Sequence, residues 1–474
     1  MITSPAFSGK SYAVLGLARS GRATVDALLA SGASVMAWDS NEEARATLES
    51  SPGLPGEGDQ PKAGGGAERS EEVSSGFASA APPPGFARSP SPARAGEDLS
   101  LRIADPLVTS LYGYSGIVVS PGVPLNRHPI ARRAREAKVP LIGDIELFAQ
   151  ARASLPPHKV VGITGTNGKS TTTALIHHIV RTAGIPAALG GNIGLPILGQ
   201  EPLPDGGVYV LELSSYQIDL THSLDCDVAI LLNVTPDHLD RYDGMDDYAA
   251  SKARLFAMQS PENVAIIAAE DDYTRAIAGQ VTGAKILVSA AQVKDQSRWP
   301  SLQGPHNAQN VAAAVAAARA LGLSGEAIAR GLETYPGLPH RMERVAEKNG
   351  ILFVNDSKAT NPTSTAPALA AYPAVHWILG GLPKSDELHA CEPYLGHVRA
   401  AYTIGEAGPM FAQLLSPKLP VSECGVLDAA VQAAAGAAKP GEVVLLSPAC
   451  ASFDQFKDYE ARGDAFRAAV EGLS

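Results

Sequence analysis

The chain has 474 residues, of which 45% are hydrophobic and 18% charged, and its formal net charge is −11. This length predicts two to four domains, and the acidic charge argues against a nucleic-acid partner, because a domain that neutralises phosphates needs a basic face. The chain lacks a long apolar run and a signal-peptide pattern, so we expect a cytoplasmic protein without membrane insertion. Its four cysteines form no C-x-x-C pair, so neither a zinc site nor a disulfide framework is indicated.

The N-terminal segment has the layout of a half-size dinucleotide-binding unit. Residues 11–15 predict a strand, the glycine turn at 16–21 leads into a helix, and residues 35–38 predict a second strand that ends at Asp39. The spacing G-x-x-x-x-G differs from the G-x-G-x-x-G of NAD sites. The pattern therefore indicates an NAD site, a site for the phosphates of another nucleotide, or only close packing of a strand against a helix.

Between residues 51 and 100 the composition changes to runs such as GGG, PPP and SPSPAR. Such a segment buries too little apolar surface to offset its ordering entropy, so we expect a disordered insertion. A short helical pattern is predicted from Leu101, then strands over 116–119 and 139–142. The Ser-Pro-Gly turn at 120–122 indicates either a ligand-binding loop or ordinary turn chemistry.

Residues 159–174, KVVGITGTNGKSTTTA, carry the motif around which the chain is organised. The apolar run 160–163 predicts a buried strand, and a helix is predicted to begin at Lys169 after a glycine-containing turn. The turn's N–H groups, the helix N-terminus and Lys169 would hold phosphates, while the Ser170 hydroxyl would reach Mg²⁺. Ile163 replaces the first glycine of the strict motif, but the GTNGKS core still predicts nucleoside triphosphate binding.

The next segment alternates strands with helices, which predicts a parallel sheet. A loop is expected over 190–194, and strands over 208–213 and 228–232 are followed by polar residues, NVTPDHLDRY in the second case. Lys252 lies on a predicted amphipathic helix, where a lysine is ordinarily solvated. Asn307 and Asn310 lie one helical turn apart and would present amides on one face, although Asn307 would equally suit a helix cap.

The last third of the chain predicts a second α/β sheet. LPHR at 338–341 is the expected hinge, and strands are expected over 351–355, 377–379, 400–404 and 443–446, with a closing helix over 458–470. Polar or basic loops follow three of these strands. This sheet edge is therefore predicted to bind an anion.

Seven motifs occur in order along the chain: GTNGKS, ELSSYQ, NVTPDHLDRY, GPHNAQN, LPHR, DSKATN and SPACASFDQF. Together they resemble the Mur ligases of peptidoglycan synthesis, over the whole chain except 51–100. The resemblance implies an α/β protein of three domains and a cytoplasmic, monomeric, ATP-dependent ligase. The implied domains are a Rossmann-like UDP-substrate domain over 1–143, a central ATP-binding P-loop-type domain over 144–337 and a Rossmann-like amino-acid-binding domain over 338–474.

DSKATN, SPACAS and the short GLARSG domain favour the family reaction that adds D-glutamate to UDP-N-acetylmuramoyl-L-alanine. ATP would phosphorylate the alanine carboxylate, and the amine of D-glutamate would displace the phosphate, giving an amide, ADP and phosphate. The alternatives are another amide ligase of the superfamily, such as folylpolyglutamate synthetase, or a non-catalytic nucleotide-binding homologue.

Matching the family motifs residue by residue implies the roles of individual side chains. ATP would be bound by Gly165, Thr166, Asn167, Gly168, Lys169, Ser170, Thr171, Asn307, Asn310, Arg341 and Asp356. Two Mg²⁺ ions would be held by Ser170, Glu212, His238 and Lys252, the last as a carbamate. The catalytic residues would be Lys169, Asn192, His238 and Lys252.

The same matching implies a site for each of the other two substrates. The UDP-linked substrate would contact Arg19, Ser20, Asp39, Ser120, Pro121, Gly122 and Asn192, which replaces the NAD interpretation of the first domain. D-glutamate would contact Lys358, Thr360, Lys384, Ser452, Phe453 and Tyr459.

Overall fold

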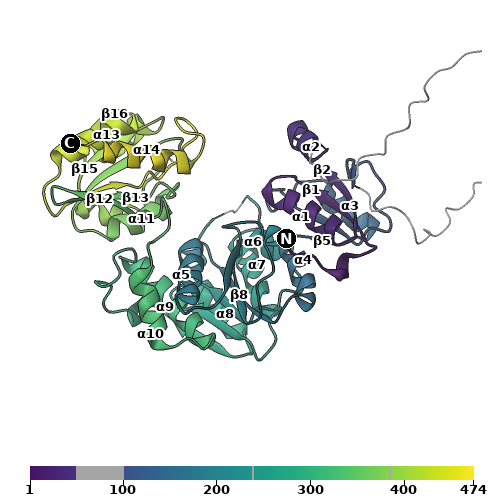
Figure 1. Ribbon diagram of the computed structural model, residues 1–474. Coiled ribbons are helices and arrows are strands. Elements are labelled where there is room, and N and C mark those ends of the chain that lie inside the picture. Colours follow the sequence, from purple (N-terminus) through teal and green to yellow (C-terminus); the bar gives the residue numbers. More distant parts are fainter. Residues whose placement is uncertain (50–100, 238–239, 385, 474) are drawn as a thin grey trace, which may run out of the picture.

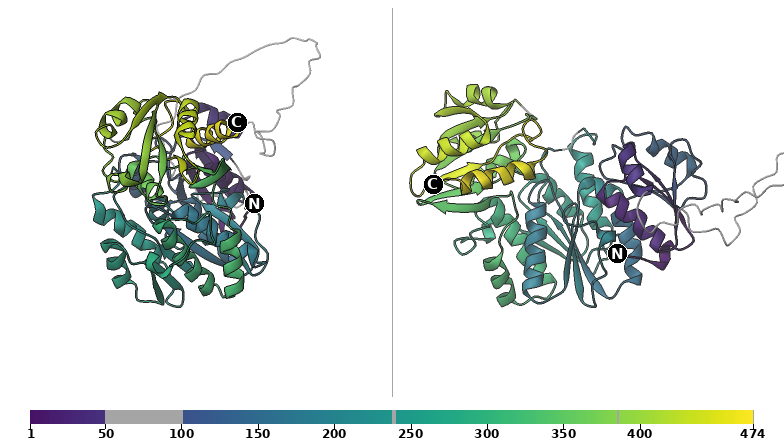
Figure 2. Two further views of the ribbon diagram at one scale, coloured as in Figure 1. Left: turned by 90° about the vertical axis from the view of Figure 1, so that its left-hand side faces the viewer. Right: turned by 45° about the horizontal axis from the view of Figure 1, so that its top comes forward.

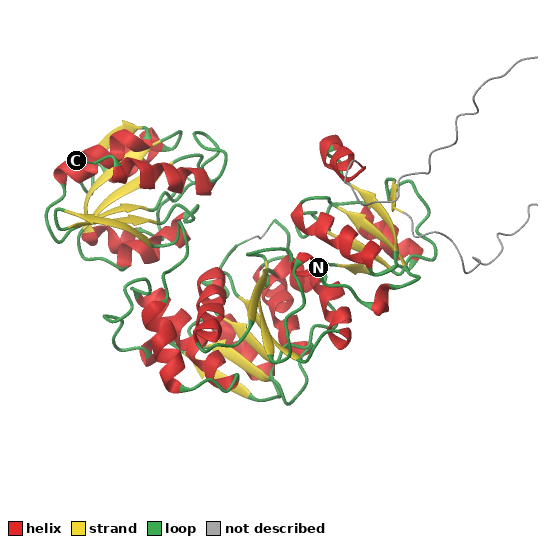
Figure 3. Cartoon of the chain, viewed as in Figure 1, coloured by secondary structure: helices red, strands yellow, loops and turns green. Residues whose placement is uncertain are grey.

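The computed structural model describes residues 1–49, 101–237, 240–384 and 386–473. The predicted insertion and His238 therefore lie outside the described residues. Three sheets of five, six and six strands follow one another along the chain, and the part with the second sheet lies between the other two (Figures 1 and 2). Helices accompany every sheet (Figure 3). The predicted α/β fold class is confirmed.

The first sheet is parallel and has the strand order β3-β2-β1-β4-β5. Its elements are β1 (Ser11–Leu15), α1 (Arg19–Ala30), β2 (Ser34–Trp38), α2 (Glu42–Glu49), β3 (Leu101–Ile103), β4 (Gly116–Val119), α3 (Ile130–Ala137) and β5 (Leu141–Ile142). The helical pattern predicted from Leu101 is wrong. Residues 101–103 are too few to define a periodicity, and hydrogen bonding to the free edge of β2 makes them a strand.

The second sheet is also parallel, with the order β11-β10-β9-β6-β8-β7. Its strands are β6 (His158–Thr164), β7 (Ala187–Gly191), β8 (Gly207–Glu212), β9 (Val228–Leu231), β10 (Val264–Ala268) and β11 (Lys285–Val288). The predicted loop over 190–194 is partly wrong, because Gly190 and Gly191 pair with β8 as the end of β7.

The helices around the second sheet are α4 (Asp144–Ala151), α5 (Lys169–Thr182), α6 (Ser215–Asp219), α7 (Met245–Ala257), α8 (Asp272–Gln280), α9 (Pro305–Ala320) and α10 (Gly325–Thr334). One core contains Ile176 and Ile179 of α5 together with the alanine-rich face of α9. Small side chains let the helices approach closely, and at Gly331 of α10 even a methyl group would crowd Ile179. This packing fixes α5, and with it the loop that precedes α5.

The third sheet has the order β12-β13-β17-β14-β15-β16, in which only β12 runs antiparallel to its neighbour. Its elements are β12 (Glu343–Lys348), β13 (Ile351–Asn355), α11 (Pro362–Ala370), β14 (Val375–Gly380), β15 (Val398–Ile404), α12 (Gly408–Leu415), β16 (Val421–Gly425), α13 (Leu427–Ala437), β17 (Val443–Leu446) and α14 (Tyr459–Glu471). The sequence did not predict the two edge strands β12 and β16, which are partly exposed and lack an apolar run. The helices in the described part of the chain are too short or too polar to span a membrane.

Candidate active site

The glycine turn between β6 and α5 is shaped by two glycines and held by one asparagine. Gly165 and Gly168 have φ angles of +147° and +82°, which side chains rarely adopt. Asn233, in the loop after β9, accepts hydrogen bonds from Thr166 N (2.9 Å, to its carbonyl) and Asn167 N (2.8 Å, to Oδ1). We did not assign Asn233 from the sequence, although it opens NVTPDHLDRY at a strand end.

Lys169 and Ser170 lie at the start of α5. Lys169 Nζ donates to the carbonyl oxygens of Gly165 (2.9 Å) and Thr166 (2.7 Å). Desolvation lowers the pKa of Lys169, although the Glu212 carboxylate opposes this shift. Arg341, from the segment that leads into the third sheet, donates from Nη2 to Ser170 Oγ at 2.8 Å. The N-terminus of α5 therefore has two cationic side chains beside it, Lys169 from the helix itself and Arg341 from the segment before the third sheet.

Glu212 ends β8 beside the turn, and only 2% of its surface is exposed. Its Oε1 accepts a hydrogen bond from Asn192 Nδ2 at 2.9 Å, whereas Oε2 is buried and has no hydrogen-bond partner among the residues that the structure describes. Gly191 lets the strands approach this closely, because a Cβ there would overlap the Glu212 carbonyl. A buried carboxylate oxygen without a partner is costly unless a cation or a donor binds it, and hard cations such as Mg²⁺ prefer oxygen ligands.

Lys252 is not the solvated side chain that its helix predicted, because only 1% of its surface is exposed. Its Nζ donates to the Gly165 carbonyl at 3.0 Å and lies 4.4 Å from the ring centroid of Tyr248. Burial, and then the nearby charge of Lys169, lower the pKa of Lys252 well below its usual value. Two amines therefore converge on one carbonyl of the turn.

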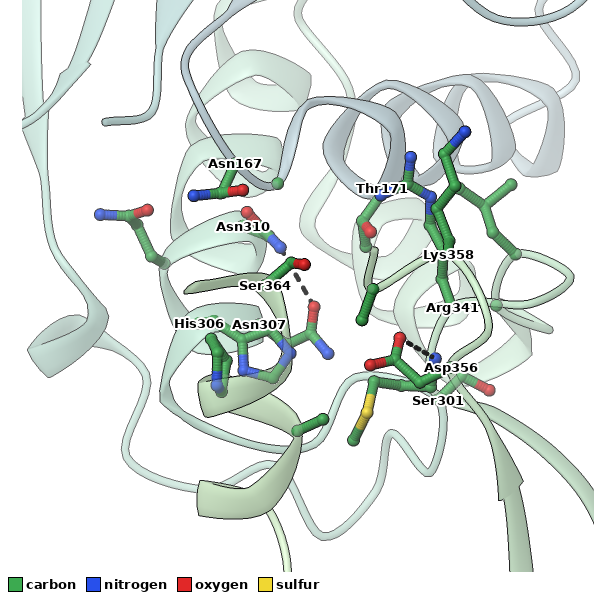
Figure 4. Close-up of a pocket in the computed structure, with 18 of the residues that line it drawn as sticks. Asn167, Thr171, Ser301, His306, Asn307, Asn310, Arg341, Asp356, Lys358 and Ser364 are labelled. Atoms are coloured by element: carbon green, nitrogen blue, oxygen red, sulfur yellow. Dashed lines mark hydrogen bonds between the residues drawn. The ribbon is translucent and has the colours of Figure 1, made fainter. Parts of the chain in front are cut away.

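A pocket opens between this turn, α9 and the third sheet. Of the residues predicted to bind ATP, its lining contains Asn167, Gly168, Thr171, Asn307, Asn310, Arg341 and Asp356, whereas Gly165, Thr166, Lys169 and Ser170 are not part of it. Figure 4 shows the amides of Asn167, Asn307 and Asn310 on one side and Arg341 and Asp356 on the other. Asn310 Nδ2 donates to Asn307 Oδ1 at 3.1 Å, so the two amides lie on one face of α9 as predicted from their spacing. The alternative is wrong, because the N-cap of α9 is Gly304 and not Asn307. The pocket has the mixed polar lining that a nucleoside requires.

Asp356 is held in place at the end of β13. Its Oδ1 accepts from Met342 N at 3.2 Å, and its Oδ2 accepts from Ser447 Oγ at 2.8 Å. Burial raises the pKa of Asp356 to about 7. A carboxyl group held in this way is suited to bind hydroxyl groups of a ribose.

Two further side chains line this pocket that the sequence did not lead us to assign. His306 Nδ1 and Tyr335 Oη are both buried without a hydrogen-bond partner among the described residues. Burial lowers the pKa of His306 to about 4, so its ring is neutral at physiological pH. His306 belongs to the motif GPHNAQN, and membership of this motif is the sequence feature that could have indicated a role for it.

The residues predicted to contact the UDP-linked substrate gather at the carboxyl edge of the first sheet, except Asn192. Asp39 Oδ2 accepts from Leu17 N at 2.6 Å and thereby shapes the glycine turn before α1. Ser120 Oγ donates to the Gly16 carbonyl at 3.2 Å, while Arg19 and Ser20 begin α1. The Gly122 carbonyl accepts from Arg241 Nη2 at 2.8 Å, which ties this edge to the loop after β9.

The residues predicted to contact D-glutamate come from three loops at the carboxyl edge of the third sheet. Lys358 Nζ lies 3.6 Å from the ring centroid of Tyr459, and Lys384 Nζ donates to Thr360 Oγ1 at 3.3 Å. Burial, with a smaller effect of Arg341, lowers the pKa of Lys358 to about 8. Ser452 is buried, whereas the Phe453 side chain is 69% exposed.

Comparison with known proteins adds independent findings. The Mur ligase middle domain matches residues 163–301, and the Mur ligase, glutamate ligase domain matches residues 340–450. The chain is 59% identical to the UDP-N-acetylmuramoylalanine–D-glutamate ligase of Novosphingobium aromaticivorans, over 100% of this chain and 97% of that protein.

Solved structures show the same fold. The UDP-N-acetylmuramate–alanine ligase of Thermotoga maritima matches with a TM-score of 0.53 and 15% identity, covering 98% of this chain and 99% of that chain. A MurF ligase from Thermotoga maritima, solved in complex with ADP, matches with a TM-score of 0.53 and 18% identity over 76% of this chain and 90% of that one. With the full-length identity to the Novosphingobium protein, these findings show that the chain belongs to the Mur ligase family.

Proposed function

We propose that this chain is an ATP-dependent ligase that joins D-glutamate to UDP-N-acetylmuramoyl-L-alanine in the synthesis of peptidoglycan precursors. The observation that carries the proposal is the full-length identity of 59% to the Novosphingobium ligase, and the 2.8 Å contact of Arg341 with Ser170 supports it by bringing a cation from the C-terminal part of the chain to the proposed phosphate-binding turn. We propose the domain boundaries 1–143, 144–337 and 338–474, a monomer, and action in the cytoplasm.

The reaction needs two anions to meet, so the protein's task is to position them and to balance their charge. An oxygen of the alanine carboxylate attacks the γ-phosphorus of ATP, ADP leaves, and an acyl phosphate forms. The D-glutamate amine then attacks the carbonyl carbon, phosphate leaves with the C–O bond electrons, and the amine loses a proton. Lys169 would leave its two carbonyl contacts to bind the phosphates, and Asn192, held by Glu212, would orient the reacting carboxylate.

We also propose two Mg²⁺ sites. The buried Glu212 Oε2, which has no partner within the described parts of the chain, supports one of them, with the Ser170 hydroxyl as a second ligand. His238 and Lys252 would hold the other ion after the Lys252 amine adds CO₂ and loses a proton to become a carbamate, which is an oxygen ligand. Bound Mg²⁺ would neutralise phosphate charge.

The remaining assigned residues would bind the substrates. Asn307 and Asn310 would face the adenine, and Arg341 and Asp356 would contact the phosphates and ribose. The UDP end would lie at the first sheet near Arg19, Ser20, Asp39 and the 120–122 turn. D-glutamate would lie against the loops that carry Lys358, Thr360, Lys384, Ser452, Phe453 and Tyr459.

Phosphate release from ATP tests this proposal directly. We expect release by the purified protein to require both UDP-N-acetylmuramoyl-L-alanine and D-glutamate, because the acyl phosphate needs the first and its capture needs the second. L-glutamate should be inert. Turnover with a folate substrate in place of the UDP-linked substrate would contradict the assignment.

The lowered pKa of Lys358 gives a second prediction, on pH. With a pKa of about 8, Lys358 is charged below pH 8 and loses its charge as the pH rises through this value. An anionic amino acid should then bind more weakly, and we expect the KM for D-glutamate to rise by up to about tenfold between pH 7 and pH 9. The measurement is the pH profile of that KM.

Lys358→Arg is the matched control for this profile, since a guanidinium keeps its charge over the whole range. Titration of the D-glutamate amine is common to both proteins, so the difference between the two profiles reports on Lys358. If the KM for D-glutamate changes with pH in the same way in both proteins, the charge of Lys358 does not contribute to D-glutamate binding.

A further inference from the structure

Arg462, in the first turns of α14, is a buried cation of the third domain that the roles given above do not explain. Only 1% of its surface is exposed, and it is among the largest fully buried side chains. Burial lowers the pKa of Arg462 to about 10, so the guanidinium remains charged at physiological pH. Burying a charged group is costly, and a protein retains such a group only where its hydrogen bonds are satisfied.

The guanidinium bonds to three separate strand-end loops. Its Nε donates to Ser357 Oγ at 3.0 Å, and its Nη2 donates to the carbonyls of Ser357 (2.9 Å) and Cys450 (3.0 Å). Its Nη1 donates to the Ala451 carbonyl at 3.1 Å and, at 3.5 Å, to the Gly380 carbonyl. The acceptors are one hydroxyl and four backbone carbonyls, and none of these bonds goes to a carboxylate. The bonds therefore fix the position of the main chain in the loops.

The three loops are those that bring together the residues assigned to D-glutamate. Ser357 is next to Lys358, Ala451 is next to Ser452, and Gly380 ends the strand before Lys384. The planar fork of arginine can reach several acceptors at fixed relative positions, which a lysine ammonium cannot. Gly381 leaves room for this fork, because a Cβ there would lie 3.0 Å from Arg462 Nη1.

We infer that Arg462 is a positioning residue for the amino-acid substrate, whose guanidinium sets the distances between the loops that carry Lys358, Lys384 and Ser452. The inference rests on the proposed function. Arg462 lies beneath these loops and touches none of the reacting atoms. Its loss should therefore weaken D-glutamate binding selectively. Lys358 also lines the nucleotide pocket, but Asp356, beside Ser357, is held there by Met342 and Ser447, and the first domain uses other contacts.

Arg462→Lys tests the inference by its effect on three separate KM values. We expect the KM for D-glutamate to rise by about tenfold or more, since a shift of about 1 Å in binding groups is already costly. The KM values for ATP and for the UDP-linked substrate should stay within about twofold. Arg467→Lys is the matched control on the same helix, because Arg467 bonds to Glu343 and Asp464 and not to the loops.

Ser357→Ala provides a second, smaller change in case the first variant does not fold. It removes the hydroxyl that accepts from Arg462 and donates to the Tyr459 carbonyl at 2.8 Å. We expect the same selectivity with a rise of about threefold, as suits the loss of a single hydrogen bond. An unchanged KM for D-glutamate, or an equal rise in all three KM values, would overturn the inference in either variant.

The two possible failures can be told apart with the unmodified protein. If it does not turn over with D-glutamate, the proposed function is wrong and this inference is wrong with it. If it turns over and the folded Arg462→Lys protein keeps its KM for D-glutamate, only the inference is wrong.

Discussion

Replacement of Lys169 by alanine should lower kcat by about 1000-fold or more, on the scale seen when a single charge-stabilising donor is removed from an active site. The amine lies at the N-terminus of α5, where its own turn supplies carbonyl acceptors at 2.7 and 2.9 Å. These neutral contacts can be exchanged for phosphate oxygens, which bind a cation more strongly. The measurement is phosphate release at saturating concentrations of all three substrates.

Lys159→Ala is the matched control for this experiment. Lys159 lies on β6, the strand that leads into the same turn, but its side chain is exposed. We expect this variant to keep its kcat within about twofold, as usual for a surface substitution. If Lys169→Ala keeps most of its kcat, the turn does not bind the transferred phosphate.

The conformation of the turn between β6 and α5 could be predicted because all of its determinants are local. The apolar run of β6, the two glycines and the helix-forming residues after Lys169 are contiguous, so spacing alone indicates strand, turn and helix. The strands β1, β2, β4, β6, β8, β9, β13, β14, β15 and β17 and the helix α9 were predicted for the same reason, whereas the interior strand β10 (Val264–Ala268), although it is an apolar run, was missed. Edge strands were not, because β3 has only three residues and β12, with the sequence ERVAEK, has no apolar run.

The contacts that assemble the site could not be predicted from local pattern. Arg341 reaches Ser170 across 171 positions of sequence, and Lys252 reaches Gly165 across 87. The helical pattern around Lys252 predicts a solvated lysine, and only tertiary packing against the turn buries it. Resemblance to the family motifs supplied the role of Lys252, whereas Arg462 and Asn233 received no role because their bonds go to backbone atoms of distant loops.

Replacement of Lys252 by alanine should lower kcat by about 100-fold or more, the upper range for loss of a group that supports a metal site. If the functional group at this position is a carbamate, the variant lacks a carboxylate-like oxygen ligand and keeps the space for one. Added formate or acetate should then restore activity. Recovery should be partial, about tenfold, because an untethered acid lacks the effective molarity of a tethered group.

Chloride at equal ionic strength is the control for the added acid, since screening alone should restore nothing. Arg254→Ala is the control for the variant. Arg254 lies two residues further along α7 and donates to the Thr221 carbonyl at 3.0 Å, away from the turn, so short acids should not change the activity of the Arg254→Ala variant.

A carbamate supplies oxygens and an ammonium ion supplies only N–H donors, so rescue by acids separates the two states of Lys252. A Lys252→Ala protein that is folded, inactive and unaffected by every acid would show that the buried amine acts without CO₂, as a cation beside the phosphates.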